Sequence, residues 1–207
     1  KSNGINVFLP TFQYSEAPTA QSLGFESDFL VPCSPQSPAF KALKDTGMKI
    51  VIPADILYPR DNGIPSMEND PLTQLIACAG REQIFGISNY DEPAFQGIKI
   101  KEVKSLFERV KAIDNTIPVL MVHGPLVLDK PEFASQEQRN EYLNNVAIYS
   151  EFADMVGFDV YPVTTDVAKV GSPQSQGNIV GHDEAIPGYI NWLRENLPGK
   201  KHLMVYQ

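Results

Sequence analysis

The chain alternates short apolar runs with longer stretches in which apolar residues recur every three or four positions. Short runs rich in β-branched residues predict strands, and the three-to-four spacing predicts amphipathic helices. The strands are predicted at Ile5–Pro10, Met48–Pro53, Ile84–Pro93, Pro118–Gly124, Met155–Pro162 and His202–Gln207. Six strands that alternate with helices indicate βαβ units and a parallel sheet.

The helices carry recognisable start and stop signals. A Ser or Asp before Pro is a typical helix start, and so is a Ser followed three residues later by Gln. Gly47 is a typical helix end. Helices are predicted after Ser37-Pro38, after Asp70-Pro71, after Ser135 with Gln138, over Ile100–Ile113 and over Ile186–Leu197.

The third predicted strand, Ile84–Pro93, ends in two adjacent carboxylates. Alternation with period two places Glu92 on the face of Gly86, opposite Phe85 and Ile87. Pro93 lacks a backbone donor and is expected to end the strand. The sequence therefore predicts a strand that delivers Asp91 and Glu92 to one edge of the sheet.

Two architectures compete for this pattern. A doubly wound sheet usually has a glycine-rich phosphate-binding turn after its first strand, and Pro10–Gln13 is not such a turn. A barrel carries its chemistry in the loops that follow the strands, and the long loops here follow the first, second and fifth strands. We therefore expect an α/β fold, a (β/α)8 TIM barrel, with about six of its eight βα units visible in one domain over residues 1–207.

Composition narrows the possible partners. The net charge is −8, with no cluster of Lys and Arg, which argues against a nucleic-acid-binding surface. No apolar run approaches the ~20 residues that span a bilayer, and Lys1–Gly4 is not a signal peptide. Cys33 and Cys78 are expected to be two unpaired thiols, although a single bridge between them stays open.

Parallel strands bring their carboxyl ends to one rim, where polar side chains gather. Tyr58, in the loop after the second strand, is a candidate for stacking on a sugar ring, as are Phe12 and Tyr14. His182 and His202 have no partner at metal-ligand spacing, so no role is assigned to them, and the leading hypothesis below needs no metal and no cofactor. The residues expected at the rim are Asn89, Asp91, Glu92, His123, Asp159, Tyr161 and Gln207.

Three stretches, Lys44–Pro53, Phe85–Pro93 and Gly157–Pro162, together resemble the large clan of (β/α)8 retaining glycoside hydrolases that includes the β-galactosidases. The piece Asp91-Glu92-Pro93 is similar to the clan's fourth-strand motif, in which the Glu is the general acid/base. In that register the visible strands correspond to the second to seventh of the clan. The resemblance thus implies that strands one and eight are missing and that the chain is part of a longer protein.

The chain departs from the clan at two positions. The clan usually has Asn before the acid/base, whereas this chain has Asp91. The clan's nucleophile is a Glu at the end of strand seven, and the matching residue here is Gln207, whose amide cannot act as a carboxylate nucleophile. Asp159 or a residue beyond Gln207 would then have to supply the second carboxylate.

Our leading hypothesis is a secreted or periplasmic glycoside hydrolase that acts on an oligosaccharide or polysaccharide. Glu92 would be the proton donor, which requires a raised pKa, and Asp159 or Asp91 would be the second carboxylate. Two other hypotheses stay open: a non-catalytic barrel that binds glycan or serves as a scaffold, and a metal-dependent hydrolase using His123, Asp159 and Glu92. The residues expected to contact sugar are Asn89, Asp91, His123, Tyr161, Gln207 and Tyr58.

Overall fold

A computed structural model describes residues 7–8, 38–58, 60, 64–127, 133–160, 170–171 and 182–206 of the chain. Residue contacts divide the chain into two compact units. The first unit comprises Lys1–Ser88 and Ser105–Pro118, and the second comprises Asn89–Lys104 and Val119–Gln207. The expectation of one domain over residues 1–207 stays a prediction.

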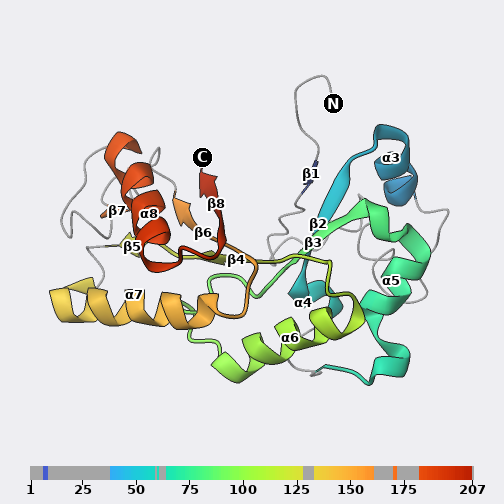
Figure 1. Ribbon diagram of the computed structural model, residues 1–207, viewed down its shortest axis with the longest axis horizontal. Coiled ribbons are helices and arrows are strands. Elements are labelled where there is room, and N and C mark those ends of the chain that lie inside the picture. Colours follow the sequence, from blue (N-terminus) through green and yellow to red (C-terminus); the bar gives the residue numbers. More distant parts are fainter. Residues whose placement is uncertain are drawn as a thin grey trace. The chain divides into compact units, whose positions relative to one another are not determined.

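The first unit is built on three parallel strands in the order β1-β2-β3 (Figure 1). Strand β2 is buried along Ile50, Val51 and Ile52, as expected for a parallel strand that is covered on both faces. Helix α6 (Ile100–Ile113) belongs in part to each unit. The unit's other elements are β1 (Val7–Phe8), α3 (Pro38–Thr46), β2 (Lys49–Pro53), α4 (Ala54–Leu57), η2 (Met67–Asn69), α5 (Pro71–Ala79), η3 (Arg81–Gln83) and β3 (Ile84–Ser88).

The second unit has its own three parallel strands, β4 (Val119–His123), β6 (Met155–Val160) and β8 (Lys201–Tyr206), in that order. Helix α8 (His182–Asn196) packs on β6 and β8. The ring centroid of Phe158 in β6 lies 4.5 Å from that of Tyr189 and 5.7 Å from that of Trp192. Trp192 is thus a packing residue. The unit's remaining elements are β5 (Leu126–Val127), α7 (Gln136–Ser150) and β7 (Val170–Gly171), with β5 antiparallel to β7 (Figure 1).

The structure overturns the expected (β/α)8 TIM barrel. The strands within each unit are parallel and alternate with helices, so the α/β class is confirmed. In the described part of the chain, however, the outermost strands β1 and β8 each have a single neighbour in the strand order. Every strand of a closed barrel has two neighbours, and closing this architecture takes eight strands. The described segments therefore form an α/β fold with parallel strands in each unit, and they do not form a closed eight-stranded barrel.

The helix end predicted at Gly47 is confirmed. Gly47 has φ of 61°, the left-handed conformation that glycine adopts without a steric penalty. Its N–H donates to the Lys44 carbonyl at 3.2 Å, and the next N–H, of Met48, donates to the Leu43 carbonyl at 3.1 Å. These two bonds form a Schellman motif, which ends α3 and turns the chain into β2.

Two predicted helix starts are also confirmed. The Asp70 carboxylate accepts a hydrogen bond from the Leu72 N–H at 2.9 Å, and Pro71 occupies the first turn of α5. At α7 the Ser135 hydroxyl accepts from the Gln138 N–H at 3.1 Å, while the Gln138 side chain accepts from the Ser135 N–H at 2.9 Å. Ser135 and Gln138 thus form the predicted capping box.

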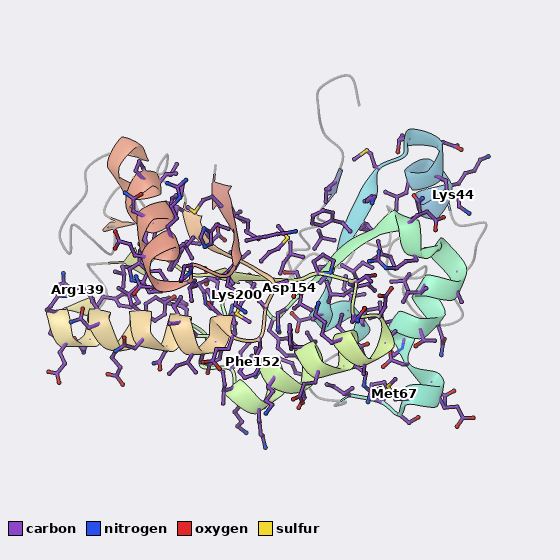
Figure 2. The ribbon with its side chains drawn as sticks, viewed as in Figure 1. Lys44, Met67, Arg139, Phe152, Asp154 and Lys200 are labelled. Atoms are coloured by element: carbon purple, nitrogen blue, oxygen red, sulfur yellow. The ribbon has the colours of Figure 1, made fainter. Side chains whose placement is uncertain are left out.

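Asp154 ties together the starts of the strands in the second unit. Its carboxylate accepts from the Val119 N–H at 2.7 Å, and its own N–H donates to the Val119 carbonyl at 2.8 Å. Its carbonyl accepts from the Lys201 N–H at 3.2 Å, and the neighbouring Lys200 ammonium donates to the Ala153 carbonyl at 2.7 Å. Figure 2 shows the Asp154 and Lys200 side chains on the ribbon of this unit. One residue therefore aligns the entries to β4, β6 and β8.

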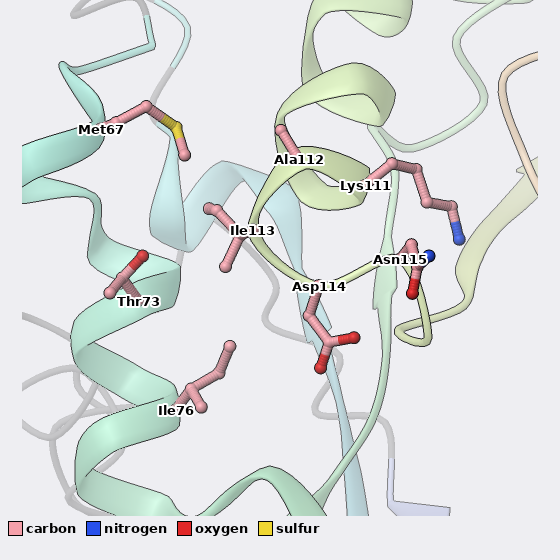
Figure 3. Close-up of a pocket in the computed structure, with 8 residues that line it drawn as sticks. All are labelled: Met67, Thr73, Ile76, Lys111, Ala112, Ile113, Asp114 and Asn115. Carbon is pink, nitrogen blue, oxygen red and sulfur yellow. The ribbon is translucent and has the colours of Figure 1, made fainter.

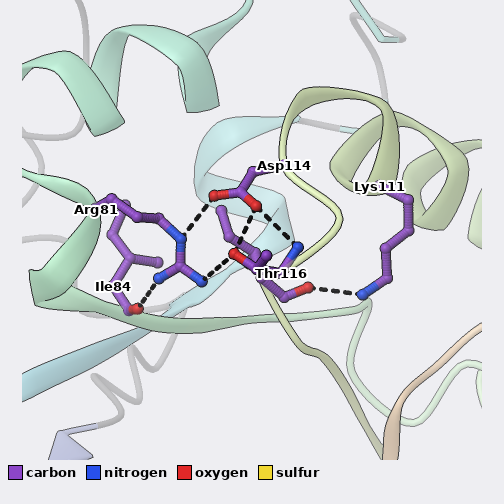
Figure 4. Close-up of polar contacts among 6 residues, drawn as sticks. Arg81, Ile84, Lys111, Asp114 and Thr116 are labelled. Carbon is purple, nitrogen blue, oxygen red and sulfur yellow. Dashed lines mark hydrogen bonds and ion pairs between the residues drawn. The ribbon is translucent and has the colours of Figure 1, made fainter.

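Arg81 plays a similar part in the first unit. Its guanidinium forms an ion pair with Asp114 at 2.7 Å and donates to the Ile84 carbonyl at 2.7 Å and to the Thr116 hydroxyl at 3.1 Å (Figure 4). Thr116 and Arg81 together hold the pKa of the Asp114 carboxyl below its usual value, the Thr116 hydroxyl contributing most. The end of α6 is thereby joined to the start of β3.

The structure bears on two expectations drawn from composition: unpaired cysteines and no membrane-spanning segment. Cys78, in α5, is disulfide-bonded, so the expectation that it is an unpaired thiol is wrong. Cys33 lies outside the described residues. In the described part of the chain no helix has the length and apolar character needed to cross a bilayer.

Candidate functional site

The candidate site lies in the second unit, at the carboxyl ends of its strands. Strand β4 ends at His123, which is in register with Phe158 of β6, so Gly124 and Asp159 are the next residues at the same edge. Asp159 is half-buried, with its Oδ1 atom buried, and alternation directs it away from the face on which Phe158 meets α8. The sheet therefore presents Asp159 at the same edge as Gly124.

The segment before Glu92 is shorter as a strand than predicted. Strand β3 ends at Ser88, so the expectation that it runs to Pro93 is wrong. Glu92 has φ of 40°, and it is the one non-glycine residue with positive φ in the described part of the chain. Its carbonyl accepts from the N–H groups of Phe95 and Gln96, each at 2.9 Å. Glu92 therefore stands in a tight turn, in a backbone conformation that is rare and energetically costly for a residue with a side chain.

The Glu92 carboxylate lies directly on Gly124. A Cβ atom built at Gly124 would be 3.0 Å from Oε1, 3.1 Å from Cδ and 3.3 Å from Oε2 of Glu92. Gly124 is itself held by Tyr142 of α7, whose hydroxyl donates to the Gly124 carbonyl at 2.6 Å. We call Gly124 and Tyr142 together the Glu92 seat. Glu92 is half-buried there, whereas Asp91 is exposed.

The seat is electrostatically coupled to Glu92. Burial raises the pKa of the Tyr142 hydroxyl well above its usual value, and the negative charges of Glu92 and of an ionised Tyr189 raise it further. Tyr142 therefore stays a neutral hydrogen-bond donor at every physiological pH. Tyr142 also packs in an aromatic cluster, where its ring centroid lies 5.1 Å from that of Phe133 and 6.4 Å from that of Phe95. This cluster fixes the hydroxyl that holds Gly124.

His123 and Asn89 are turned into the protein interior. His123 is 0% exposed, and its Nε2 lies 3.1 Å from the Ser150 hydroxyl of α7. Asn89 is 3% exposed, and its Oδ1 accepts from the Tyr90 N–H at 2.8 Å. Its amide nitrogen donates to the Val103 carbonyl at 3.4 Å. A sugar contact by either residue stays a prediction, and the structure gives both a packing role.

The buried His123 should make the protein less stable in mild acid. Burial lowers its pKa from 6.5 to about 3 in the folded chain. Between these values the unfolded chain binds a proton that the folded chain does not, so stability falls as pH falls. We expect wild type to lose about 2 kcal/mol more of its free energy of unfolding than His123→Gln between pH ~7.5 and ~5, measured by urea denaturation. Parallel pH dependences of the two proteins would contradict this.

Tyr58 belongs to the first unit and is not a surface ring. It is 1% exposed, and its hydroxyl donates to the Asp70 carboxylate at 2.8 Å. Asp70 is 0% exposed and is also paired with the Arg109 guanidinium at 2.8 Å. Burial and the Asp70 hydrogen bond raise the pKa of Tyr58 far above its usual value. The hydroxyl therefore serves as a permanent donor in a buried polar cluster.

Tyr161 and Gln207 lie outside the described residues. No three or more His, Cys, Asp or Glu residues of the described segments form a group that could hold a metal ion. The hypothesis of a metal-dependent hydrolase using His123, Asp159 and Glu92 stays a prediction.

A surface depression of about 740 Å³ lies in the first unit, between α5 and the end of α6 (Figure 3). Its walls combine apolar side chains with a few polar ones. The lining residues are Met67, Thr73, Ile76, Lys111, Ala112, Ile113, Asp114 and Asn115. Asp114 interacts with Arg81 and Thr116. Among the predicted site residues that the structure describes, none lines the depression.

Comparison with known proteins adds little to this picture. No protein-family model and no curated protein matches the sequence. The solved structure of N2152 from Neocallimastix frontalis is similar over 82% of this chain and 40% of that protein, with 14% sequence identity and a TM-score of 0.47. The chain thus spans about two fifths of that protein's length. Likeness at this level carries no argument about function.

Sequence reasoning missed the residues that hold Glu92. The sequence pattern indicates Gly124 only as the end of a strand, and it gives no signal for Tyr142 or Phe133. Gly124, Tyr142 and Glu92 come from three separate segments, so no local spacing connects them. The one local signal was the glycine directly after His123, because a glycine at a strand end often marks a close approach of another group.

Proposed function

We propose that this chain is a glycoside hydrolase in which Glu92 donates the proton to the leaving-group oxygen. The observation that carries the proposal is the placement of the Glu92 carboxylate on Gly124, half-buried, at the carboxyl edge of the second unit's strands. Costly backbone conformations such as that of Glu92 cluster at active sites. The resemblance of Asp91-Glu92-Pro93 to the acid/base motif of retaining glycoside hydrolases also supports this role.

The proposed chemistry requires a second carboxylate. Asp159 is the candidate, because it stands at the edge to which Gly124 also belongs. In retaining enzymes the two carboxyl groups are about 5 Å apart and the second is the nucleophile, whereas at about 6.5 to 9.5 Å it activates a water. Asp91 is exposed and would support the site electrostatically. No cofactor is needed for either route.

The proposed substrate is an oligosaccharide or polysaccharide, as in the clan that the motif resembles. We propose a secreted or periplasmic location, where such substrates are found. The disulfide at Cys78 supports this location, because disulfides persist mainly in oxidising compartments.

A second candidate function is glycan binding without catalysis. The observation that favours it is Gln207, which occupies the position that matches the clan's nucleophilic Glu. An amide at that position can bind a sugar hydroxyl but cannot form a glycosyl-enzyme intermediate. Under this alternative Glu92 would be a hydrogen-bond acceptor for sugar.

Two parallel assays distinguish hydrolysis from glycan binding. Purified protein is incubated with a panel of 4-nitrophenyl glycosides that differ in sugar and anomer, and release of 4-nitrophenol is followed. In parallel the melting temperature is measured with the matching free sugars. We expect hydrolysis of at least one glycoside. A sugar-dependent rise in melting temperature without hydrolysis would support binding alone, and no response in either assay would reject both functions.

A further inference from the structure

The contact between Glu92 and Gly124 is too tight for a side chain at position 124 unless the Glu92 carboxylate moves. Cβ contacts of 3.0 to 3.4 Å are tighter than ordinary van der Waals contact, so an added methyl group would displace the carboxylate by a few tenths of an ångström. The nearest atoms belong to the end of a flexible side chain. Alanine at this position should therefore move Glu92 and leave the backbone in place.

The backbone at Gly124 is restrained by two contacts with α7. It follows His123, which is buried and paired with Ser150 of α7. Its carbonyl accepts the short hydrogen bond from Tyr142, also of α7, at 2.6 Å. The turn that carries Glu92 is restrained as well, by the two N–H groups that donate to the Glu92 carbonyl. The carboxylate is thus held between two fixed pieces of backbone.

We propose that Gly124 and Tyr142 are positioning residues for Glu92: the bare Cα of Gly124 sets where the carboxylate rests, and the Tyr142 hydroxyl fixes Gly124. The inference rests on the proposed function for its catalytic consequence and on the contacts alone for its structural part. Catalytic groups must be held within about 0.5 Å of the productive position, and misplacement by about 1 Å costs about 100-fold in rate. A displacement of a few tenths of an ångström should accordingly cost about tenfold.

The first test reads the carboxylate directly and needs no activity. In protein labelled with ¹³C at the Glu side-chain carboxyl, the Glu92 signal is identified by its loss in Glu92→Gln. We expect Gly124→Ala to shift this signal and Gly199→Ala to leave it unchanged, because no atom lies within 4 Å of a Cβ at Gly199. An unchanged signal in Gly124→Ala would overturn the proposal.

Tyr142→Phe provides a second variant with the same prediction. It removes only the hydroxyl that donates to Gly124 and keeps the ring that packs on Phe133. We expect the Glu92 signal to shift here too, by less than in Gly124→Ala. If Gly124→Ala does not fold, the result for Tyr142→Phe decides, and an unchanged Glu92 signal then overturns the proposal.

The second test uses hydrolysis. We expect Gly124→Ala to lower kcat about tenfold with KM within about twofold of wild type, because the carboxylate is misplaced while sugar binding is kept. Glu92→Asp, which withdraws the carboxyl by one methylene, should cost less in the Gly124→Ala background than alone. Additive losses would reject the direct contact as the cause. If wild type hydrolyses nothing, the proposed function fails while the carboxyl signal still decides the positioning role.

Discussion

The Glu92→Gln variant is expected to retain its fold and to lose about 10²- to 10⁴-fold of its glycoside hydrolysis, the usual contribution of general acid catalysis. Gln has nearly the same shape as Glu, so it can rest on Gly124 and keep the backbone turn at φ of 40°. It cannot donate the acidic proton that the leaving oxygen requires. The measurement is kcat/KM for each glycoside that wild type hydrolyses.

The leaving group makes this prediction specific to a proton donor. When the glycosidic C–O bond of a 2,4-dinitrophenyl glycoside breaks, 2,4-dinitrophenolate leaves without protonation, so Glu92→Gln should slow its cleavage much less than that of a 4-nitrophenyl or methyl glycoside. Glu195→Gln is the matched control, because Glu195 is exposed on α8 of the same unit. Equal losses for all leaving groups would assign Glu92 a role other than proton donation, and full activity would remove it from the mechanism.

Local patterns predicted the individual elements well. The helices α5 and α7 begin where Asp70 and the pair Ser135 and Gln138 indicated, because a cap is a contact between residues two or three positions apart. The strands β2, β4 and β6 fall within their predicted apolar runs. Signals of this kind need no knowledge of the rest of the fold.

The closure of the sheet could not be read in the same way. Alternating strands and helices specify parallel pairing, and both barrels and open sheets satisfy that pattern. The number of strands and the pairing of the first with the last decide between the two, and no short stretch of sequence encodes either. The expected TIM barrel therefore failed, while the α/β class and the parallel direction held.

The candidate site was predicted in part, for the same reason. The alternation argument assumed that the strand continues to Glu92, but β3 ends at Ser88 and the turn at Glu92 has positive φ. The Glu92 carboxylate instead lies against Gly124, which comes from another segment. As strand-end residues, His123 and Asn89 are expected to be accessible. In the structure both are buried, and each forms a hydrogen bond with a group remote in sequence.

Gly157 lies in close contact with the neighbouring strand β8 of the second unit. It is in register with Leu203 of β8, and a Cβ atom at Gly157 would lie 2.1 Å from the Leu203 carbonyl oxygen and 2.7 Å from its carbonyl carbon. Real Cβ atoms essentially never approach so closely, and the obstacle is backbone. The neighbouring strand can move only by giving up ladder hydrogen bonds, so no local adjustment relieves the overlap.

Gly157→Ala is therefore expected to lower the free energy of unfolding by at least about 3 kcal/mol, the upper range for overpacking. Urea denaturation measures this as a lower midpoint at unchanged slope. Gly199→Ala is the matched control: no atom lies within 4 Å of its Cβ, and it should change stability by less than about 1 kcal/mol, in the stabilising direction. Equal midpoints for Gly157→Ala and wild type would show that β6 and β8 can separate without cost. Because Asp159 lies two residues beyond Gly157 on β6, the same close pairing also fixes the strand that presents the proposed second carboxylate.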